Sequence, residues 1–174
     1  MNILEKFKPV KLIAMDVDGV LTDGKLILLK DLSYARSMNI KDGYAIQLAV
    51  KKGYHILVIS GAAHDHAVES RLKKLGVEDV HMGVTDKSEV MISHILKWNL
   101  QPDQVLFIGD DIPDISAMKN AGLKCCPADA VQDIKAVVDY ISPFDGGGGC
   151  VRDIIEKVLK LNQDWDHHSD ISSK

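Results

Sequence analysis

The sequence has few cysteines and no cysteine pattern that could hold a structure together. Three occur in 174 residues: Cys125, Cys126 and Cys150. An odd number without metal-ligand spacing indicates neither a disulfide framework nor a zinc site. A bridge between the neighbours Cys125 and Cys126 would strain disulfide geometry. We therefore expect small apolar core residues in a reducing compartment.

Long apolar runs and an excess of positive charge are missing as well. No stretch approaches the roughly 18 apolar residues of a membrane span, and residues 1–10 hold no signal-peptide-like run. Lys and Arg number 21 against 25 Asp and Glu, a net charge of −4, whereas nucleic-acid binding through counterion release needs a basic face. We expect a cytoplasmic protein that binds neither nucleic acid nor membrane, although a local cluster could still bind an anionic substrate.

What the chain does contain is enough apolar sequence for one compact domain. Apolar residues make up 46% and charged residues 26%, which is a globular composition. A length of 174 residues suits one domain better than two. We place that domain at residues 1–164 and expect a polar, flexible tail at residues 165–174.

Short apolar runs rich in β-branched residues alternate with helical patterns. Such repeated strand–helix units predict a doubly wound, Rossmann-like α/β fold, with a parallel sheet between two helical layers. Lys25–Leu29 and Ser33–Met38 predict a small β-hairpin. The expected sheet strands are Val10–Met15, His55–Ile59, Asp79–Met82, Gln104–Ile108, Leu123–Cys126 and Val138–Ile141. The expected helices are Asp42–Lys52, His64–Leu75, Asp86–Trp98, Pro113–Asn120, Val131–Val137 and Val151–Leu161.

Polar residues follow three of these strands, and ligands of such folds bind at the carboxyl ends of strands. Asp16 and Asp18 follow the first strand, Ser60 the second, and Asp110 and Asp111 a later one. Two carboxylates so close repel each other unless a cation or a proton lies between them. The set of oxygens suits a hard divalent cation, and Mg²⁺ is the usual ion for phosphate chemistry.

The same groups permit phosphoryl transfer through a covalent aspartate. One carboxylate could attack phosphorus while the other protonates the leaving alcohol and then activates water. A metal would offset the repulsion between the anionic nucleophile and the anionic ester. Ser60, before Gly61, could donate hydrogen bonds to the transferring group. Lys87 opens a helix, where a cation opposes the helix dipole but suits a cluster of anions.

Four segments resemble, in order, the motifs of the haloacid dehalogenase superfamily of phosphatases. Asp16–Gly24 resembles the first motif, Ile59–Gly61 the second, Lys87 the third and Gly109–Asp114 the fourth. Each lies after a predicted strand, and together they span nearly the whole chain.

The resemblance implies a role for each of these residues. Asp16 would be the nucleophile and Asp18 the general acid and base. Mg²⁺ would be held by Asp16, the backbone carbonyl of Asp18, and Asp110. The remaining implied residues are Ser60, Gly61 and Lys87 for phosphate binding, and Asp111 and Asp114 as support for the metal or for Lys87.

The spacing of the motifs leaves no room for the cap domain that many such phosphatases carry. Only the hairpin and one helix fit between Asp18 and the strand at His55. An uncovered site admits water, so a specific enzyme needs a large substrate or a wall from another subunit. An exposed two-stranded ribbon invites pairing with its copies, and we therefore expect an oligomer.

Two further segments, Ser37–Ile46 and Phe144–Asp153, resemble 3-deoxy-D-manno-octulosonate 8-phosphate phosphatases and their relatives for nine-carbon sugar-acid phosphates. This resemblance implies a capless homotetramer whose hairpins form a central barrel, with a neighbouring subunit closing the site. It implies a sugar-acid phosphate as substrate, whose carboxylate would suit Arg or Lys. The implied pocket residues are Asn39, Lys41, Asp42 and Arg152.

Some positions depart from that subfamily and keep other substrates open. Ala62 and Ala63 follow Gly61 where octulosonate phosphatases commonly have arginine, and Lys41 stands where arginine is expected. Losing the guanidinium fork favours a different sugar phosphate or a broad specificity as the alternative.

Two alternatives belong to other classes of protein. A signalling receiver domain also combines clustered aspartates, a hydroxyl and a lysine on a doubly wound sheet. Its phosphoacceptor follows a central strand, however, where this chain has Ser60. The second is a catalytically idle interaction domain, against which the intact pair Asp16 and Asp18 argues.

Overall fold

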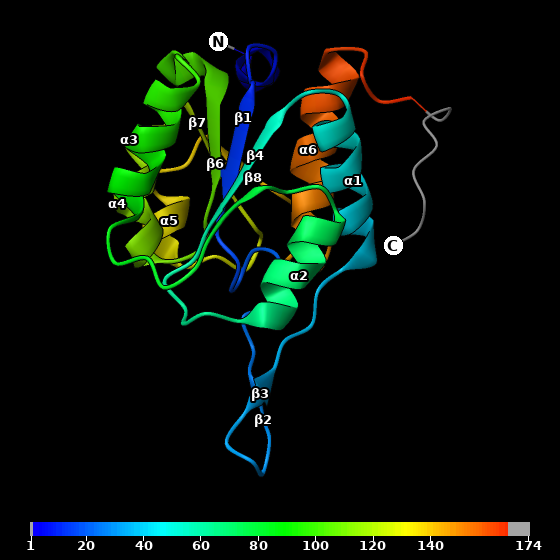
Figure 1. Ribbon diagram of the computed structural model, residues 1–174. Coiled ribbons are helices and arrows are strands. Elements are labelled where there is room, and N and C mark those ends of the chain that lie inside the picture. The colour runs from blue at the N-terminus through cyan, green and yellow to red at the C-terminus, as the bar shows by residue number, and fades with distance from the viewer. Residues whose placement is uncertain (1, 167–174) are drawn as a thin grey trace.

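The computed structural model describes residues 2–166, and its middle layer is a six-stranded sheet in which every neighbouring pair is parallel (Figure 1). The strand order across the sheet is β5-β4-β1-β6-β7-β8. These strands are β1 (Leu12–Met15), β4 (His55–Ile59), β5 (Asp79–His81), β6 (Val105–Ile108), β7 (Leu123–Cys126) and β8 (Tyr140–Ile141). The predicted doubly wound α/β fold is confirmed.

This strand order decides between two doubly wound folds. Counted along the chain, the six strands lie in the order 3-2-1-4-5-6, which is the Rossmann order, whereas receiver domains have the order 2-1-3-4-5. The receiver alternative is therefore wrong. The order reverses between β1 and β6, so ligands are expected at the carboxyl ends of these two strands.

Helices pack on both faces of the sheet and bury one core on each side. The strands are apolar on both faces, because helices cover both faces of a parallel sheet; all four residues of β1 are fully buried. One core lies under α1 (Ile40–Lys51), α2 (His66–Lys74) and α6 (Cys150–Leu161). The other lies under α3 (Lys87–Lys97), α4 (Ile115–Met118) and α5 (Gln132–Lys135). As expected, the three cysteines are free and buried.

Side chains that precede the helices set where several of them begin. The carboxylate of Asp65 accepts from the backbone N–H groups of Ala67 and Val68, and Asp86 caps α3 in the same way; such N-caps satisfy donors that have no partner within the helix. Three 3₁₀ segments complete the elements: η1 (Ile3–Phe7), η2 (Pro102–Gln104) and η3 (Ile112–Asp114). The segment Ile3–Phe7 was not predicted.

The hairpin protrudes from the domain and is shorter than predicted (Figure 1). Its strands are only β2 (Ile27–Leu28) and β3 (Tyr34–Ala35), in place of the expected 25–29 and 33–38. All four strand residues are exposed, and two strands with no covering layer are marginally stable in water. Pairing therefore persists over only a few residues.

The C-terminal packing continues past the predicted domain boundary at residue 164. The indole of Trp165 packs edge-on against Tyr44, and the guanidinium of Arg152 lies 4.7 Å from the Trp165 ring centroid. Asp166 forms an ion pair with Lys52. The rest of the predicted tail, residues 167–174, lies outside the described residues. Among the helices of residues 2–166, none has the length and apolarity needed to cross a membrane.

Candidate active site

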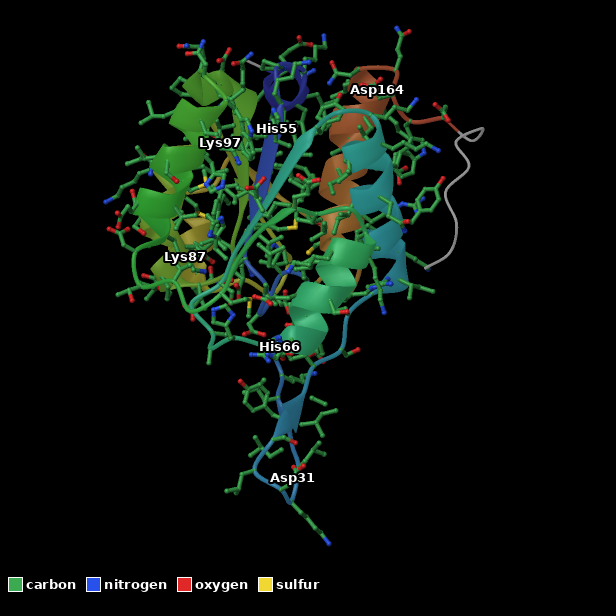
Figure 2. The ribbon with its side chains drawn as sticks, in the orientation of Figure 1. Asp31, His55, His66, Lys87, Lys97 and Asp164 are labelled. Carbon is green, nitrogen blue, oxygen red and sulfur yellow. The ribbon has the colours of Figure 1, made fainter. Side chains whose placement is uncertain are left out.

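A polar pocket lies where β1, β4 and β6 end, on the side of the domain from which the hairpin leaves. Figure 2 shows Lys87 at this end of the sheet and Asp31 at the distal tip of the hairpin. The pocket has a volume of about 290 Å³. Its lining includes all predicted motif residues except the buried Asp114: Asp16, Asp18, Ser60, Gly61, Lys87, Asp110 and Asp111.

The carboxylate of Asp16 is held at two points. Its Oδ1 accepts from the backbone N–H of Val17 at 2.6 Å, and its Oδ2 lies 2.8 Å from Lys87 Nζ. The backbone N–H of Asp16 donates to the carbonyl of Ile108, so β1 and β6 stay paired up to the site. Asp16 is therefore fixed directly after its strand with its side chain in the pocket.

Lys87 is a buried cation between two carboxylates. Its Nζ lies 2.7 Å from Asp114 Oδ1 in addition to the contact with Asp16. Burial opposes the charge on Lys87, but the two carboxylates outweigh it and raise the pKa of the ammonium group. The other oxygen of Asp114 accepts from the backbone N–H groups of Asp110 and Asp111, at 2.9 and 3.4 Å. Asp114 thus supports both Lys87 and the loop after β6.

Asp16, Asp110 and Asp114 bring carboxylate oxygens within 4.8 Å of one another. Burial raises the pKa of Asp16 to about 6, and repulsion from Asp114 adds to it. Burial and the charges of Asp114, Asp16 and Asp111 raise the pKa of Asp110 to about 7. This excess of negative charge fits a hard divalent cation. Because Asp114 already accepts from Lys87 and two amides, Asp16 and Asp110 are the donors suited to the metal.

Two glycines allow these carboxylates to come so close. A Cβ on Gly19, where φ is +81°, would lie 2.0 Å from Asp110 Oδ2, and a Cβ on Gly109 would lie 2.5 Å from Asp114 Oδ2. Only glycine fits such close approaches, and at Gly19 only glycine adopts the backbone without strain. Gly19, directly after the first aspartate pair, and Gly109, directly before the second, thus shape the site.

Asp18 is bound by an arginine that sequence reasoning missed. Arg36, on the segment returning from the hairpin, donates from Nε to Asp18 Oδ1 at 2.7 Å and from Nη2 to Asp18 Oδ2 at 3.2 Å. Its Nη1 donates to Asp65 Oδ2 at 2.7 Å. The Arg36 side chain is only 5% exposed. Its two partners stand far from it in the sequence, so no local pattern reveals this contact.

Ser60 and Gly61 form the wall of the pocket at the end of β4. Ser60 is buried, its backbone N–H donates to the carbonyl of His81, and its Oγ accepts from the N–H of Ala62 at 3.1 Å. The hydroxyl hydrogen of Ser60 is thereby left for a bound group. Ser60 and Gly61 therefore lie where the resemblance placed them.

The structure does not bring the four predicted sugar-pocket residues to this pocket. Asn39 caps α1 and donates from Nδ2 to the carbonyl of Gly147, and Lys41 is exposed outside it. Arg152 pairs with Glu156 and covers the Trp165 ring. None of the four lines the pocket.

Asp42 lies buried between α1 and α6, outside the pocket. Asp42 is only 1% exposed. Its Oδ1 accepts a hydrogen bond at 2.7 Å from the backbone N–H of Arg152, which lies in the first turn of α6. Gly149, the N-cap residue of α6, has no side chain for that task. Asp42 is thus a cap supplied from α1, and its other oxygen is buried without a partner among the described residues.

Comparison with known proteins gives consistent matches that cover most of the chain. Residues 39–122 match the haloacid dehalogenase-like hydrolases. The 3-deoxy-D-manno-octulosonate 8-phosphate phosphatase KdsC of Escherichia coli K12 is 29% identical over 158 residues, 91% of this chain and 84% of that protein.

Solved structures agree with the sequence match. The crystal structure of 3-deoxy-D-manno-octulosonate 8-phosphate phosphatase from Yersinia pestis aligns with a TM-score of 0.89 at 27% identity, covering 93% of this chain and 87% of that one. The Moraxella catarrhalis phosphatase of the same name, in complex with magnesium, phosphate and KDO, aligns with a TM-score of 0.86 at 33% identity, covering 91% and 90%.

Proposed function

We propose a substrate and a mechanism from one premise: this chain belongs to the haloacid dehalogenase superfamily, in its capless subfamily similar to octulosonate 8-phosphate phosphatases, and is a phosphatase. The proposed reaction is Mg²⁺-dependent hydrolysis of a phosphomonoester through an aspartyl-phosphate. The observation that carries it is the position of Asp16, with one oxygen on buried Lys87 and Asp110 beside it at the switch point of the sheet.

In the first step, an oxygen of Asp16 attacks phosphorus and the bond from phosphorus to the sugar oxygen breaks. Asp18 gives its proton to the leaving alkoxide. In the second step, Asp18 takes a proton from water while the water oxygen attacks phosphorus, which releases phosphate and restores the Asp16 carboxylate. Ser60 and Lys87 would donate hydrogen bonds to the transferring group.

Magnesium fits this donor set because three carboxylates converge where Lys87 contacts two of them. Asp16, Asp110 and the backbone carbonyl of Asp18 would hold the ion, since the Asp18 side chain faces Arg36. Bound Mg²⁺ would neutralise charge on the phosphoryl oxygens and on the nucleophile. The support from outside the chain is the magnesium ion in the Moraxella structure.

Asp18 and Arg36 add a requirement to this mechanism. Both oxygens of Asp18 accept hydrogen bonds from Arg36, an arrangement that suits the step in which Asp18 takes a proton from water. For the first step, one oxygen must carry a proton and therefore leave the guanidinium. The bidentate pair thus belongs to the second step, and partial release of Arg36 belongs to the first.

The proposed substrate is an eight- or nine-carbon 2-keto-3-deoxy sugar-acid phosphate. The support is the activity named for the relatives and the KDO molecule in the Moraxella complex. Another sugar phosphate, or broad specificity, remains the alternative because Ala62 and Ala63 replace the arginine expected there. Buried free thiols suit a cytoplasmic reaction, where thiols stay reduced.

We also propose that the enzyme acts as a homotetramer joined through its hairpins. A pocket of about 290 Å³ is at the small end for ligand sites, so it holds the phosphoryl end while the sugar acid extends outward. Leu32 is 94% exposed and has a positive φ of 67°, which is an unfavourable backbone for a bulky side chain with nothing to pack against. A neighbouring copy would cover it.

The decisive test of the mechanism is Asp16→Asn. We expect hydrolysis to fall at least a thousandfold with Mg²⁺ present, while the thermal unfolding temperature stays within a few degrees of wild type. Acid-quenched turnover of ³²P-labelled substrate should leave label on the Asp16 peptide in the wild type. Asp103→Asn, an exposed aspartate outside the site, is the matched control. Unchanged hydrolysis in Asp16→Asn would refute the nucleophile.

A substrate screen tests the specificity separately from the mechanism. Phosphate release should be compared for eight-carbon and nine-carbon sugar-acid phosphates and for ordinary hexose phosphates. A preference in kcat/KM of at least tenfold for one sugar acid is expected. Equal and slow turnover of all of them would support broad specificity instead.

A further inference from the structure

A second cluster of metal-ligating side chains lies at the edge of the sheet, among residues that the proposed reaction does not use. Asp79 and His81 belong to the edge strand β5, and His94 belongs to α3. Side chains two apart in a strand point to the same face, and here that face is covered by α3. Val80, between them, packs against the core on the opposite face.

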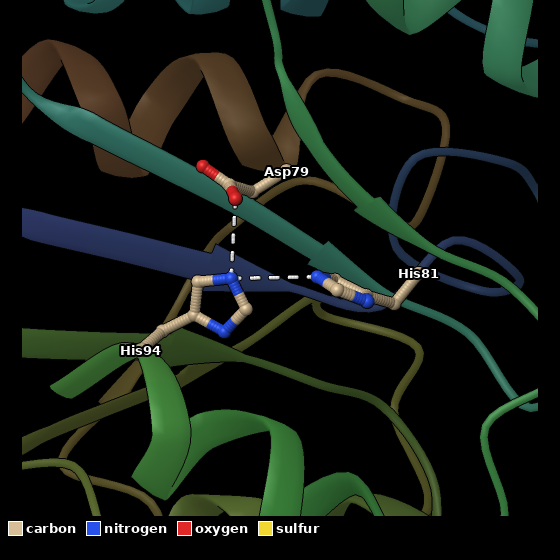
Figure 3. Close-up of side chains that lie close together, drawn as sticks. All are labelled: Asp79, His81 and His94. Atoms are coloured by element: carbon tan, nitrogen blue, oxygen red, sulfur yellow. Dashed lines mark hydrogen bonds and ion pairs between the residues drawn. The ribbon is translucent and has the colours of Figure 1, made fainter. Parts of the chain in front are cut away.

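The three side chains converge on one nitrogen, as Figure 3 shows. His94 Nε2 lies 3.2 Å from Asp79 Oδ1 and 3.4 Å from His81 Nε2. The other ring nitrogen of His94, Nδ1, lies 2.9 Å from the carbonyl oxygen of Val90. A carbonyl oxygen can only accept, so Nδ1 carries a hydrogen and Nε2 is the ring atom that is open to a proton or to a metal ion.

Nε2 faces the Asp79 carboxylate at 3.2 Å, a contact that is favourable only when a proton or a metal ion lies between the two atoms. The Nζ of Lys97 reaches the same Asp79 oxygen at 3.1 Å, but its side chain is 56% exposed and can withdraw into solvent. His94 is buried and cannot turn away. A cation at the meeting point of the three ligand atoms would satisfy all of them at once.

The spacing fits a tetrahedral ion with nitrogen ligands. Bonds of about 2.0–2.1 Å from zinc to nitrogen or oxygen place ligand atoms of a tetrahedron about 3.3 Å apart. The two separations from His94 Nε2 are 3.2 and 3.4 Å, and the ligand atoms of Asp79 and His81 lie within 4.8 Å of each other. Two imidazoles and one carboxylate are a common zinc set, with water as the fourth ligand. This set differs from the all-oxygen site at Asp16 and Asp110, which suits magnesium.

We propose that Asp79, His81 and His94 form a site for a divalent transition metal, zinc by preference, that joins β5 to α3. The helix α3 begins at Lys87, whose Nζ contacts Asp16 and Asp114. A metal bound by His94 would therefore tie α3, the helix that begins with Lys87, to the edge strand β5. Its role is to stabilise the fold, and it does not depend on the proposed substrate.

Zinc titration of the full-length protein, with Mg²⁺ in large excess to fill the oxygen site, tests the proposal. We expect saturable binding of one Zn²⁺ per chain by calorimetry. At about a hundredfold excess over Kd, the unfolding temperature should rise by about 5–10 °C. His94→Gln and Asp79→Asn should lose both effects, whereas His64→Gln, an exposed histidine outside the cluster, should keep them.

Cobalt serves as a second probe that reports coordination geometry. Co²⁺ at the cluster should give the intense visible absorption of a tetrahedral site, and the Asp110→Asn variant should keep that spectrum. Should His94→Gln fail to fold, His81→Asn, which alters a half-buried residue, provides the same test. Zinc binding that survives loss of the cluster residues, binding lost only in Asp110→Asn, or no binding at all would each overturn the proposal.

Discussion

Arg36 connects the hairpin to Asp18, the proposed acid–base residue of the site. It holds both oxygens of Asp18 and one oxygen of Asp65, which also caps α2. The pKa of Arg36 is raised, mainly by its hydrogen bond to Asp18, so the guanidinium stays charged throughout turnover. Removing it frees Asp18 and leaves the carboxylate of Asp65 without this partner.

We predict that Arg36→Gln lowers kcat/KM by about tenfold or more, because the positioned acid–base group loses its orientation. Arg36→Lys should recover only part of the loss, since an ammonium group cannot bind both oxygens as a fork. Steady-state kinetics with Mg²⁺ at saturation measures this. Equal activity of Arg36→Gln and wild type would show that Arg36 has only a structural role.

The buried carboxyl of Asp42 should make the free energy of unfolding depend on pH. Burial raises its pKa from 3.8 to about 6. Between these values the folded state binds more protons than the unfolded state, so the contribution of Asp42 to stability falls as pH rises through this window. Above about pH 6 the charged form lowers the free energy of unfolding by about 2–3 kcal/mol.

Asp42→Asn should therefore stabilise the protein by about 1–2 kcal/mol at pH 8, where the ionised group is replaced by a neutral one that still caps α6. At pH 4 the gain should vanish. Urea unfolding at both pH values measures it, with Asp42→Ala as the variant that also loses the cap. A gain of the same size at both pH values would contradict the assignment to ionisation.

At the scale of elements, hydrophobic runs predicted the sheet well. The strands at 55–59 and 123–126 have the predicted bounds, because strands covered on both faces are apolar without interruption. Short helices and the hairpin were longer in the prediction than in the structure. Their ends depend on what covers them, and a local pattern does not contain that information.

The residues of the site also fall into those that a local sequence pattern could place and those that it could not. Asp16, Ser60, Lys87 and Asp110 could be placed because each follows a strand or opens a helix at one edge of the sheet. Arg36 and Asp42 could not, because their partners lie on elements distant in the sequence. The spacing around Asp42 is the same whether its carboxylate faces a ligand or caps α6, and only the packing of α1 on α6 decides.

The hairpin exposes large apolar side chains that contact with a second subunit would bury. Leu28 is 79% exposed and Leu32 is 94% exposed, at the part of the chain farthest from the core. We predict that Leu28→Ser together with Leu32→Ser shifts the mass measured by light scattering from the tetramer to smaller species. The unfolding temperature of the isolated subunit should not fall, because neither side chain belongs to a core.

The paired control for this experiment is Leu96→Ser, which changes a leucine of similar exposure, 74%, on α3 and away from the hairpin. It should leave the mass unchanged. A wild type that is monomeric at working concentration would refute assembly through the hairpin, and so would a tetramer that survives both hairpin substitutions.

At the scale of the whole molecule, assembly and catalysis should be linked. A single subunit offers an open pocket of about 290 Å³ that none of the four predicted sugar-contacting residues lines, so it can hold a phosphoryl group but offers little to a long sugar acid. The hairpin that would join copies carries Arg36 on its return segment, and Arg36 holds Asp18. Dissociation of the proposed tetramer would therefore uncover the pocket and also loosen Asp18, the proposed acid–base residue.

We predict that specific activity toward a sugar-acid phosphate falls at least tenfold on dilution through the concentration at which the tetramer dissociates. Activity toward a small aryl phosphate should fall much less, because its phosphoryl group fills the pocket and the rest of the molecule needs few contacts from a neighbouring subunit. The double hairpin variant should show the low sugar-acid activity at every concentration. Should that variant be monomeric and still hydrolyse the sugar-acid phosphate at the wild-type rate, each subunit would be a complete site, and the substrate would have to be recognised by residues of one chain alone.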